Sequence, residues 1–271
     1  QITDLIARKN NRINRDINFI DNEFRNNILK SFSEIYSTKD PNELFDTIFD
    51  EMEKEKIINK ALSVKVEYIK ILESLNIKKN INLNEYEIFF KDFVNDILSI
   101  KKRSTFGIHV HGDKIMKSLI KYQELLRLES VIKIADEVES KKKKVRKPLM
   151  DFLKIINDFI GTSLIEKEVK LDKIGTPYIF VEPNKRISLE NLSSGEKQIV
   201  IFFAYLLLYL KQNIEGIFIV DEPEMSLHLY WQKMFVDKII EANPNIQLIF
   251  ATHAPEIIGK RRDKMVKLER E

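Results

Sequence analysis

Two short apolar runs near the end of the chain limit the folds that this sequence can adopt. Ile217–Val220 and Ile246–Ala251 are uninterrupted hydrophobic segments, and an amphipathic helix is predicted between them at His228–Ala242. Strands that are apolar on both faces are typical of parallel sheets buried between layers of helices. The region is therefore predicted to be α/β, with two parallel strands covered on both faces.

Shorter signals before and after these runs extend the same unit. Val169–Leu171 and Tyr178–Val181 are predicted to be antiparallel strands joined by a glycine–proline turn. A buried helix is expected at Ser194–Lys211, and its apolar run is too short to span a bilayer. A short helix at Pro255–Ile258 and a strand at Met265–Leu268 are expected to complete the unit.

The first half of the chain has a different pattern. From residue 1 to residue 147 apolar side chains recur at three- and four-residue steps, which indicates helices, and strand signals are almost absent. Separate helices are expected at 113–144 and 149–160, because the pattern changes near Lys147-Pro148. The predicted organisation is a helical insertion or arm at 1–147 and an α/β domain at 148–271.

The composition narrows the class of protein. The chain has no cysteine, which excludes a disulfide framework, a thiolate metal site and a cysteine nucleophile, and suits a cytoplasmic protein. Its net charge of +3 is too small to argue for nucleic-acid binding by itself. Nothing at its start resembles a signal peptide, and the chain opens on Gln1 rather than methionine. We expect it to be a fragment of a longer protein.

Two carboxylates follow the first apolar strand. Asp221 and Glu222 leave its carboxyl end, where open α/β sheets bind ligands. Asp221 could hold Mg²⁺, which prefers one or two carboxylates together with phosphate oxygens, and Glu222 could orient and deprotonate an attacking water. The alternative is an acidic turn after a core strand. His253 ends the next strand, where a histidine by itself is usually packed or solvated.

The segment Leu192–Gln198 lies at the predicted start of a helix. Ser193 is placed to cap this helix, and Glu196, three residues later, completes a capping box. The same geometry also makes an anion site, because it combines free N–H groups, a glycine and small hydroxyls. The two interpretations use the same residues and are compatible.

Taken in order, these segments resemble the ABC-type ATPase family and, within it, the AAA_21/OLD-like group. The resemblance rests on L-S-S-G-E-K-Q at 192–198, I-F-I-V-D-E-P-E at 217–224 and A-T-H-A-P-E at 251–256. It covers about residues 148–271, less than half of the chain, which would form the C-terminal half of an ABC-type head. It implies an α/β fold of the ABC-type head with a large all-helical insertion, and ATP and Mg²⁺ as cofactors.

The resemblance also assigns roles to the segment at the helix start. Ser193 and Gly195 would contact the γ-phosphate of ATP held by an opposing subunit, and Ser194 and Lys197 belong to the same nucleotide-binding segment. Ser194 stands where the family more often has glycine.

The remaining roles fall at the strand ends. The resemblance makes Glu222 and His253 catalytic, with Asp221 as the metal ligand. Ser226 and His228 occupy the place of the loop that crosses the dimer interface. Transporter members of the family usually carry a different sequence here.

A P-loop is missing from the chain. The motif G-x-x-x-x-G-K-S/T cradles phosphates through backbone N–H groups and its lysine. The nearest stretch, Gly107–Lys114, has Asp113 in place of that lysine. The same stretch contains His109 and His111, which could suggest a metal site, although a polar loop between helices is favoured. The P-loop is expected upstream of Gln1, so this chain alone would lack a complete ATP site.

Several partners and functions follow from the resemblance. It favours an ATPase subunit of an antiphage system such as Septu, in which ATP closes two heads of a homodimer or larger oligomer and controls a nuclease or other effector. Alternatives are an SMC- or RecF-like DNA-repair or chromosome ATPase, and a non-hydrolysing ATP-dependent assembly module. The basic run Lys141–Lys147 is read as solvated helix surface, with a nucleic-acid patch as the alternative. No membrane partner is expected.

Overall fold

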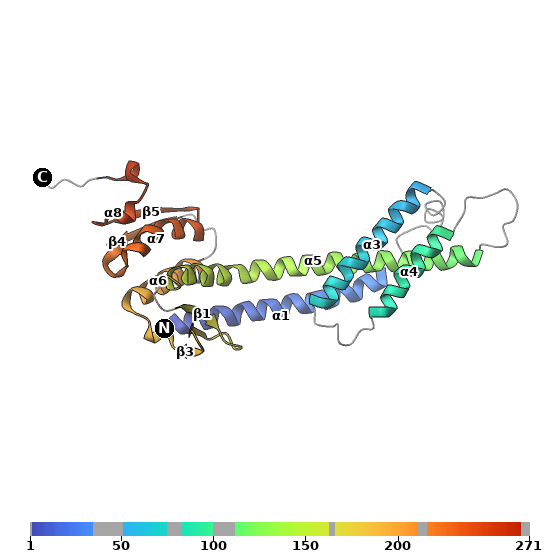
Figure 1. Cartoon of the computed structure of the whole chain (residues 1–271), viewed down its shortest axis with the longest axis horizontal. Coiled ribbons are helices and arrows are strands. Elements are labelled where there is room, and N and C mark those ends of the chain that lie inside the picture. Colours follow the sequence, from blue (N-terminus) through green and yellow to red (C-terminus); the bar gives the residue numbers. More distant parts are fainter. Residues whose placement is uncertain are drawn as a thin grey trace. The chain divides into compact units, whose positions relative to one another are not determined.

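The computed structural model describes residues 2–34, 51–74, 83–99, 112–162, 166–210 and 216–266 (Figure 1). The chain divides into two compact units. We call Gln1–Asn18 together with Lys143–Glu271 the first unit, and Phe19–Lys142 the second unit. The first residues of the chain thus lie in the same unit as its C-terminal region, and the second boundary lies near the change of pattern seen in the sequence.

The second unit is helical throughout its described part. It contains α3 (Glu51–Ser74), α4 (Leu83–Ser99) and portions of α1 (Ile2–Glu34) and α5 (Gly112–Ile160). Each helix buries one apolar stripe, as amphipathic helices do. The stripes of α3, α4 and α5 form a core that consists of Ile57, Ala61, Val64, Phe90, Phe93, Ile97, Tyr122, Leu125, Leu128 and Ile132. The expected helical character of this region is confirmed.

Helix α5 runs unbroken through Pro148, so the prediction of two separate helices at 113–144 and 149–160 is wrong. A proline inside a helix removes a backbone hydrogen bond and costs about 3 kcal/mol. Leu149 and Phe152 are buried in the core of the first unit, and Val145 packs against the same core. Burial on both sides of Pro148 offsets that cost, since each buried apolar side chain contributes roughly 1.5–3 kcal/mol.

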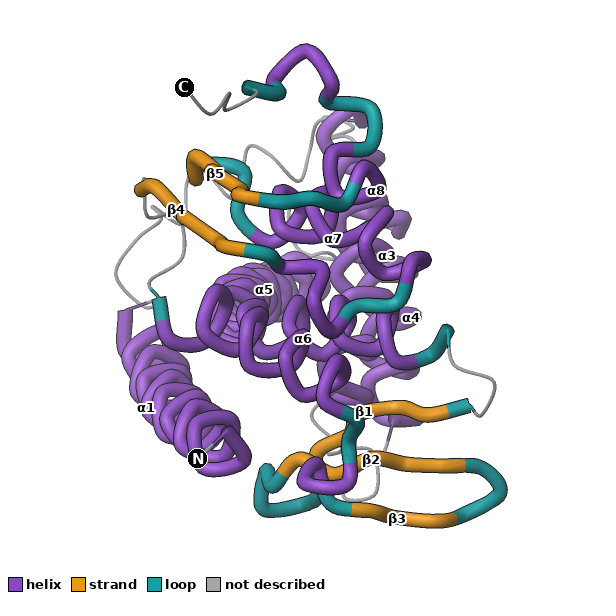
Figure 2. The backbone as a smooth tube through the Cα atoms, turned by 90° about the vertical axis from the view of Figure 1, so that its left-hand side faces the viewer, coloured by secondary structure: helices purple, strands orange, loops and turns teal. Residues whose placement is uncertain are grey.

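In the part of the first unit that the structure describes, the strands form two small sheets (Figure 2). Strands β1 (Lys167–Leu171), β2 (Pro177–Val181) and β3 (Lys185–Ile187) form an antiparallel sheet in that order. Strands β4 (Gly216–Asp221) and β5 (Ile246–Ala251) pair in parallel. The predicted strand types are confirmed, and the described fold is a mostly helical α/β protein with a small parallel sheet.

The N-terminal part of α1 is tied to the first unit by a glycine contact and by apolar burial. Gly175, in the β1–β2 turn, has φ 86°, and a Cβ atom there would lie 1.8 Å from the side-chain nitrogen of Asn10. Glycine is therefore required both by the left-handed backbone and by the close approach. Ile6, Ile13 and Ile17 of α1 belong to the core of the same unit.

Helices cover one face of the parallel strand pair. Figures 1 and 2 place α6 (Ser194–Ala204) and α7 (Leu229–Ala242) on the same side of β4 and β5. Aromatic rings fill that layer: Phe202 lies 6.1 Å from Phe218 of β4, and Phe235 lies 6.3 Å from Phe250 of β5, between ring centroids.

The opposite face of the pair is open within the described residues. Ile217 and Ile219 of β4 are 61% and 74% exposed, and Ile249 of β5 is also exposed. The prediction that both faces are covered is therefore wrong for the described part of the chain, which supplies one layer of helices to this sheet.

The remaining predictions concern the end of α6, the helix α8 and a C-terminal strand. Helix α6 gives way to a π-helical segment at Tyr205–Tyr209, so the α-helix is shorter than expected. Helix α8 (Pro255–Ile258) lies where it was predicted. Met265 is not part of a strand, and the end of the strand expected there falls outside the described residues. None of the described helices is long and apolar enough to cross a membrane.

Candidate functional site

The carboxyl ends of β4 and β5 bring two predicted segments side by side. Asp221 lies opposite Ala251 in the parallel register, and the backbone N–H of Glu222 donates a hydrogen bond of 2.8 Å to the carbonyl of Ala251. Thr252 and His253 follow directly. We call Asp221, Glu222, Glu224, Thr252 and His253 the strand-end group.

Glu222 and His253 face each other across this edge. The Nε2 atom of His253 lies 4.0 Å from Oε1 of Glu222, and the two side chains are 93% and 45% exposed. Glu222 has φ 42° and ψ 56°, in the left-handed region. For an L-residue with a side chain this conformation costs about 1–2 kcal/mol, and strained residues of this kind cluster at functional sites.

Asp221 offers a single carboxylate for a metal ion. It is exposed, and within the described residues no three His, Cys, Asp or Glu side chains converge on one point. A complete protein cage is therefore not formed in this part of the chain. One carboxylate beside open space fits Mg²⁺, because that ion keeps several waters and takes other ligands from phosphate oxygens.

Glu224 connects the two strand ends. It lies in the 3-10 turn Pro223–Ser226, and its Oε1 accepts hydrogen bonds from Thr252 Oγ1 at 2.7 Å and from the backbone N–H of His253 at 2.7 Å. Burial acts to raise the pKa of Glu224, but the hydrogen bonds outweigh it and lower the pKa below its ordinary value. The carboxylate therefore stays ionised.

The predicted capping box is present at the start of α6. The backbone N–H of Glu196 donates to Ser193 Oγ at 3.3 Å, and the N–H of Ser193 donates to Glu196 Oε2 at 2.8 Å. Lys167 Nζ of β1 lies 3.0 Å from Glu196 Oε1, and only 6% of the Glu196 side chain is exposed. Burial raises the pKa of Glu196, but these partners outweigh it, so the pKa is lowered.

Other polar groups at the same helix start face solvent. Ser193, Ser194 and Lys197 are exposed, whereas Gly195 is buried. Ser193 Oγ is an acceptor in the cap, so its hydroxyl proton can still be donated outward. We call Ser193–Lys197 the helix-start group.

Gly195 brings the segment Ser226–His228 against this helix. A Cβ atom on Gly195 would lie 2.1 Å from the carbonyl oxygen of Ser226, so a larger residue would force the backbone apart. Ser226 and His228 are exposed, and the His228 ring packs edge-on against Trp231 with centroids 5.6 Å apart. The contact gives Gly195 a structural role beside its predicted one.

Two further predictions concern the second half of the helical region. His109 and His111 lie outside the described residues, and Asp113 is exposed in the first turn of α5.

In the basic run Lys141–Lys147, three lysines have carboxylate partners. These pairs are Lys141 with Glu23, Lys142 with Asp21, and Lys147 with Asp151. The exposed positive charge of the run is therefore smaller than its sequence indicates.

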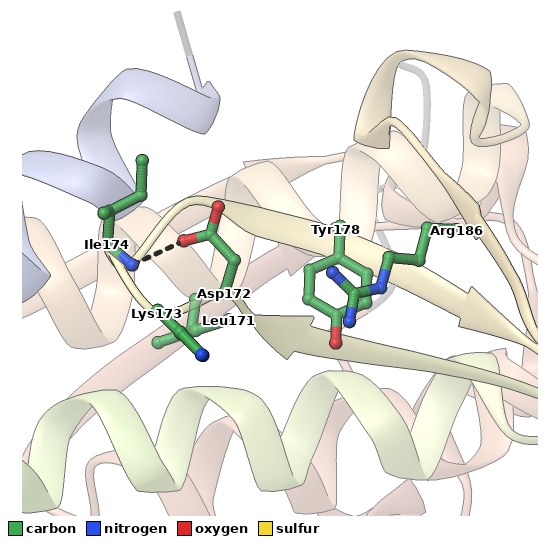
Figure 3. A pocket seen from close by; sticks show the side chains of 6 residues that line it. All are labelled: Leu171, Asp172, Lys173, Ile174, Tyr178 and Arg186. Carbon is green, nitrogen blue, oxygen red and sulfur yellow. Dashed lines mark hydrogen bonds between the residues drawn. The ribbon is translucent and has the colours of Figure 1, made fainter.

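A hollow of about 410 Å³ lies elsewhere in the first unit, at the β1–β2 turn (Figure 3). Arg186 lies over the Tyr178 ring, 4.7 Å from its centroid, and Asp172 accepts a hydrogen bond from the N–H of Ile174. None of the predicted site residues lines this hollow, so it is separate from the candidate site.

Sequence reasoning gave no role to Glu224 or Lys167. Glu224 stands in the quoted D-E-P-E segment, but its partners lie 28–30 residues further along the chain. Lys167 lies 29 residues before Glu196. No local spacing signals either contact, because both depend on how separate elements pack.

Comparison with known families agrees with the predicted resemblance. Residues 130–259 match the AAA_21 family, described as "AAA domain, putative AbiEii toxin, Type IV TA system". The matched range includes every predicted site residue of the strand ends and of the helix start.

Comparison with characterised proteins finds distant relatives. The chain is 27% identical over 207 residues to "Retron Vc95 probable ATPase" of Vibrio cholerae, which covers 69% of this chain and 38% of that protein. It is 29% identical over 110 residues to "Septu protein PtuA" of Bacillus mycoides, covering 39% of this chain and 16% of that protein. The chain thus spans well under half the length of these relatives.

Comparison with solved structures gives a weaker likeness. The Smc head domain with an extended coiled coil from Pyrococcus furiosus aligns with 76% of this chain and 51% of that chain, at 18% identity and a TM-score of 0.31. A score at this level does not establish a shared fold.

Proposed function

We infer that the chain, whose residues 130–259 match the AAA_21 family, is the hydrolytic part of a longer ATPase. One observation carries this inference. Glu222 Oε1 lies 4.0 Å from His253 Nε2 beside the exposed carboxylate of Asp221, where two parallel strands end. A carboxylate that can act as a base and a second carboxylate that can hold a metal ion are among the groups that phosphoryl transfer to water uses.

Each residue has a distinct task in this proposal. Glu222 orients a water molecule and accepts its proton as the oxygen attacks the γ-phosphate. His253, whose Nε2 reaches the same space, donates or accepts a hydrogen bond to that water or to the transferred group. The left-handed backbone at Glu222 and the distance of 4.0 Å from its Oε1 to His253 Nε2 support the assignment of these two residues to one site.

Asp221 is the residue that would hold Mg²⁺. When bound, this ion neutralises charge on the β- and γ-phosphate oxygens. No G-x-x-x-x-G-K-S/T motif occurs in residues 1–271. We therefore propose that another segment of the longer protein supplies the phosphate cradle.

The helix-start group is proposed to act on a second nucleotide, held by an opposing head. Ser193, Ser194 and Lys197 are exposed at the N-terminus of α6, where the helix dipole and free N–H groups favour an anion. ATP would then be sandwiched between two heads, and its hydrolysis would release them. Ser226 and His228, adjacent to this group through Gly195, would border the same interface.

The biological role that we propose is antiphage defence. It is supported by the similarity to a retron ATPase and to a Septu protein. Closure of the heads on ATP would control a nuclease or another effector. The identity of that effector would follow from proteins that co-purify with the full-length ATPase.

The test of the proposed function is ATP turnover by the full-length protein and its Glu222→Gln variant. The variant should bind ATP as the wild type does, because Asp221 is intact, yet its turnover should fall about 10²–10⁴-fold through loss of the base. Asp263→Asn is a matched control, because this exposed carboxylate pairs with Lys264 and lies outside the site. Turnover near the wild-type rate in Glu222→Gln would rule out the assignment.

A further inference from the structure

One carboxylate oxygen holds the backbone on both sides of His253. Oε1 of Glu224 accepts hydrogen bonds from Thr252 Oγ1 at 2.7 Å, from the N–H of His253 at 2.7 Å and from the N–H of Ala254 at 3.2 Å. The three donors belong to consecutive residues that follow β5. Thr252 Oγ1 in turn accepts a hydrogen bond of 3.0 Å from the N–H of Ala254, so the loop is linked internally as well.

The second oxygen of Glu224 argues against a direct role in chemistry. Oε2 is buried and makes no hydrogen bond with any residue that the structure describes. A general base or a Mg²⁺ ligand needs an oxygen that water or substrate can reach. Asp221 is exposed and Glu222 is partly exposed, so these neighbours are better placed for such roles.

The position of His253 depends on its backbone. Its imidazole is 93% exposed, and Nε2 lies 4.0 Å from Glu222 Oε1. Glu224 belongs to the turn that begins immediately after Glu222, so a single side chain joins the loop of the base to the loop of the histidine. A misplacement of about 1 Å at a reacting group can cost about 10²-fold in rate.

We propose that Glu224 is a positioning residue that fixes His253 opposite Glu222 for hydrolysis. This proposal rests on the function proposed above. Glu224 acts through the backbone of the loop that follows β5 and does not touch ATP. Its ionised carboxylate strengthens the three hydrogen bonds, since charge-assisted bonds are about twice as strong as neutral ones.

The experiment is a double-mutant cycle in the full-length protein with Glu224→Ala, His253→Ala and the double variant. Glu224→Ala should lower kcat about 10–100-fold through misplacement of His253, with the KM for ATP unchanged. The double variant should be no slower than His253→Ala alone, because Glu224 acts through His253. A merely structural role would instead add its own loss to that of His253→Ala.

Conservative variants sharpen the test. Glu224→Gln keeps an oxygen acceptor at the same place and should recover part of the rate, whereas Thr252→Val removes one donor and should give a smaller loss of kcat. If thermal unfolding shows that Glu224→Ala does not fold, the same cycle is run with Glu224→Gln and Thr252→Val. Asp263→Ala, at an exposed position beside Lys264, is the control.

The outcomes separate the two proposals. A wild-type protein without ATP turnover would contradict the proposed function itself. A wild-type protein with turnover, but with an unchanged kcat in Glu224→Ala or additive losses in the cycle, would overturn the positioning role alone. Non-additive losses with an unchanged KM would support it.

Discussion

The strand-end group and the helix-start group are built in different ways. At the strand ends, Glu222 is partly exposed and His253 is exposed, and backbone hydrogen bonds to neighbouring residues hold both of them. At the helix start, Ser193 both faces solvent and caps α6, and the buried Glu196 completes the cap. Under the proposed function, the side chains assigned to chemistry at the strand ends differ from those that hold the fold, whereas at the helix start Ser193 would serve both purposes.

The largest effect that we expect is a loss of ATP turnover, and it tests the strand-end group. Glu222→Gly should lower ATP turnover about 10²–10⁴-fold, because the base is lost. Its free energy of unfolding should stay the same or rise by up to about 1 kcal/mol, because glycine adopts the left-handed backbone without strain. Glu222→Ala, which loses the base but keeps the strain, is the matched control. Calorimetric unfolding that shows Glu222→Gly less stable than Glu222→Ala would contradict the comparison.

Gly195→Val should be the most destabilising change at the helix start. The new Cβ would meet the Ser226 carbonyl oxygen at 2.1 Å, and that backbone has little room to move. Overpacking of this kind costs about 3 kcal/mol at the upper end of the usual range. Urea denaturation measures the loss, and Ser194→Val at the exposed neighbouring position is its control. Equal stability of the two variants would show that the contact is loose.

Lys167→Met should give the next largest loss of stability. It leaves the Glu196 carboxylate buried without its cation, and breaking a fully buried pair costs about 3–5 kcal/mol. Because 23% of the Lys167 side chain is exposed, we expect about 2 kcal/mol here. Lys170→Met, which removes a lysine from an exposed pair in the same strand, should cost under about 0.5 kcal/mol.

The pair of Lys167 and Glu196 predicts that the stability of the protein depends on pH. The pKa of Glu196 is lowered in the folded protein from its ordinary 4.5. Its contribution to stability is therefore present above pH 4.5 and is lost as the pH falls through the folded value. Lys167→Met should move this loss to higher pH, which unfolding curves at pH 7 and pH 4 would reveal. An unchanged pH profile would show that Lys167 does not hold the charge of Glu196.

The smallest effect separates two adjacent serines. Ser193→Ala removes the side-chain cap of α6 and should cost about 1 kcal/mol. Ser194→Ala, one residue later and exposed, should change stability by less than about 0.5 kcal/mol. Thermal unfolding of both variants measures the difference. If the two serines behaved alike, the helix start would not carry the dual role described above.

Some parts of the fold could be predicted because their causes are local. The continuous apolar runs of β4 and β5 predicted a parallel pair, and residues 193 and 196 predicted a capping box at the correct spacing. The prediction of a helix break near Pro148 was wrong, because apolar burial on both sides of the proline outweighs its penalty in a helix. Within the described residues one face of β4 is open, which was also not predicted, because an apolar run indicates that a strand favours burial but not which element covers it.

By itself, the sequence determined the element types, the order of the motifs and the family resemblance, which the match to AAA_21 confirmed. Only the tertiary structure decided which of these residues meet. The register that pairs Asp221 with Ala251 places His253 4.0 Å from Glu222, and the same register lets Glu224 reach a loop 28 residues away. Such contacts arise from the packing of separate elements, so no periodicity or spacing along the chain encodes them locally.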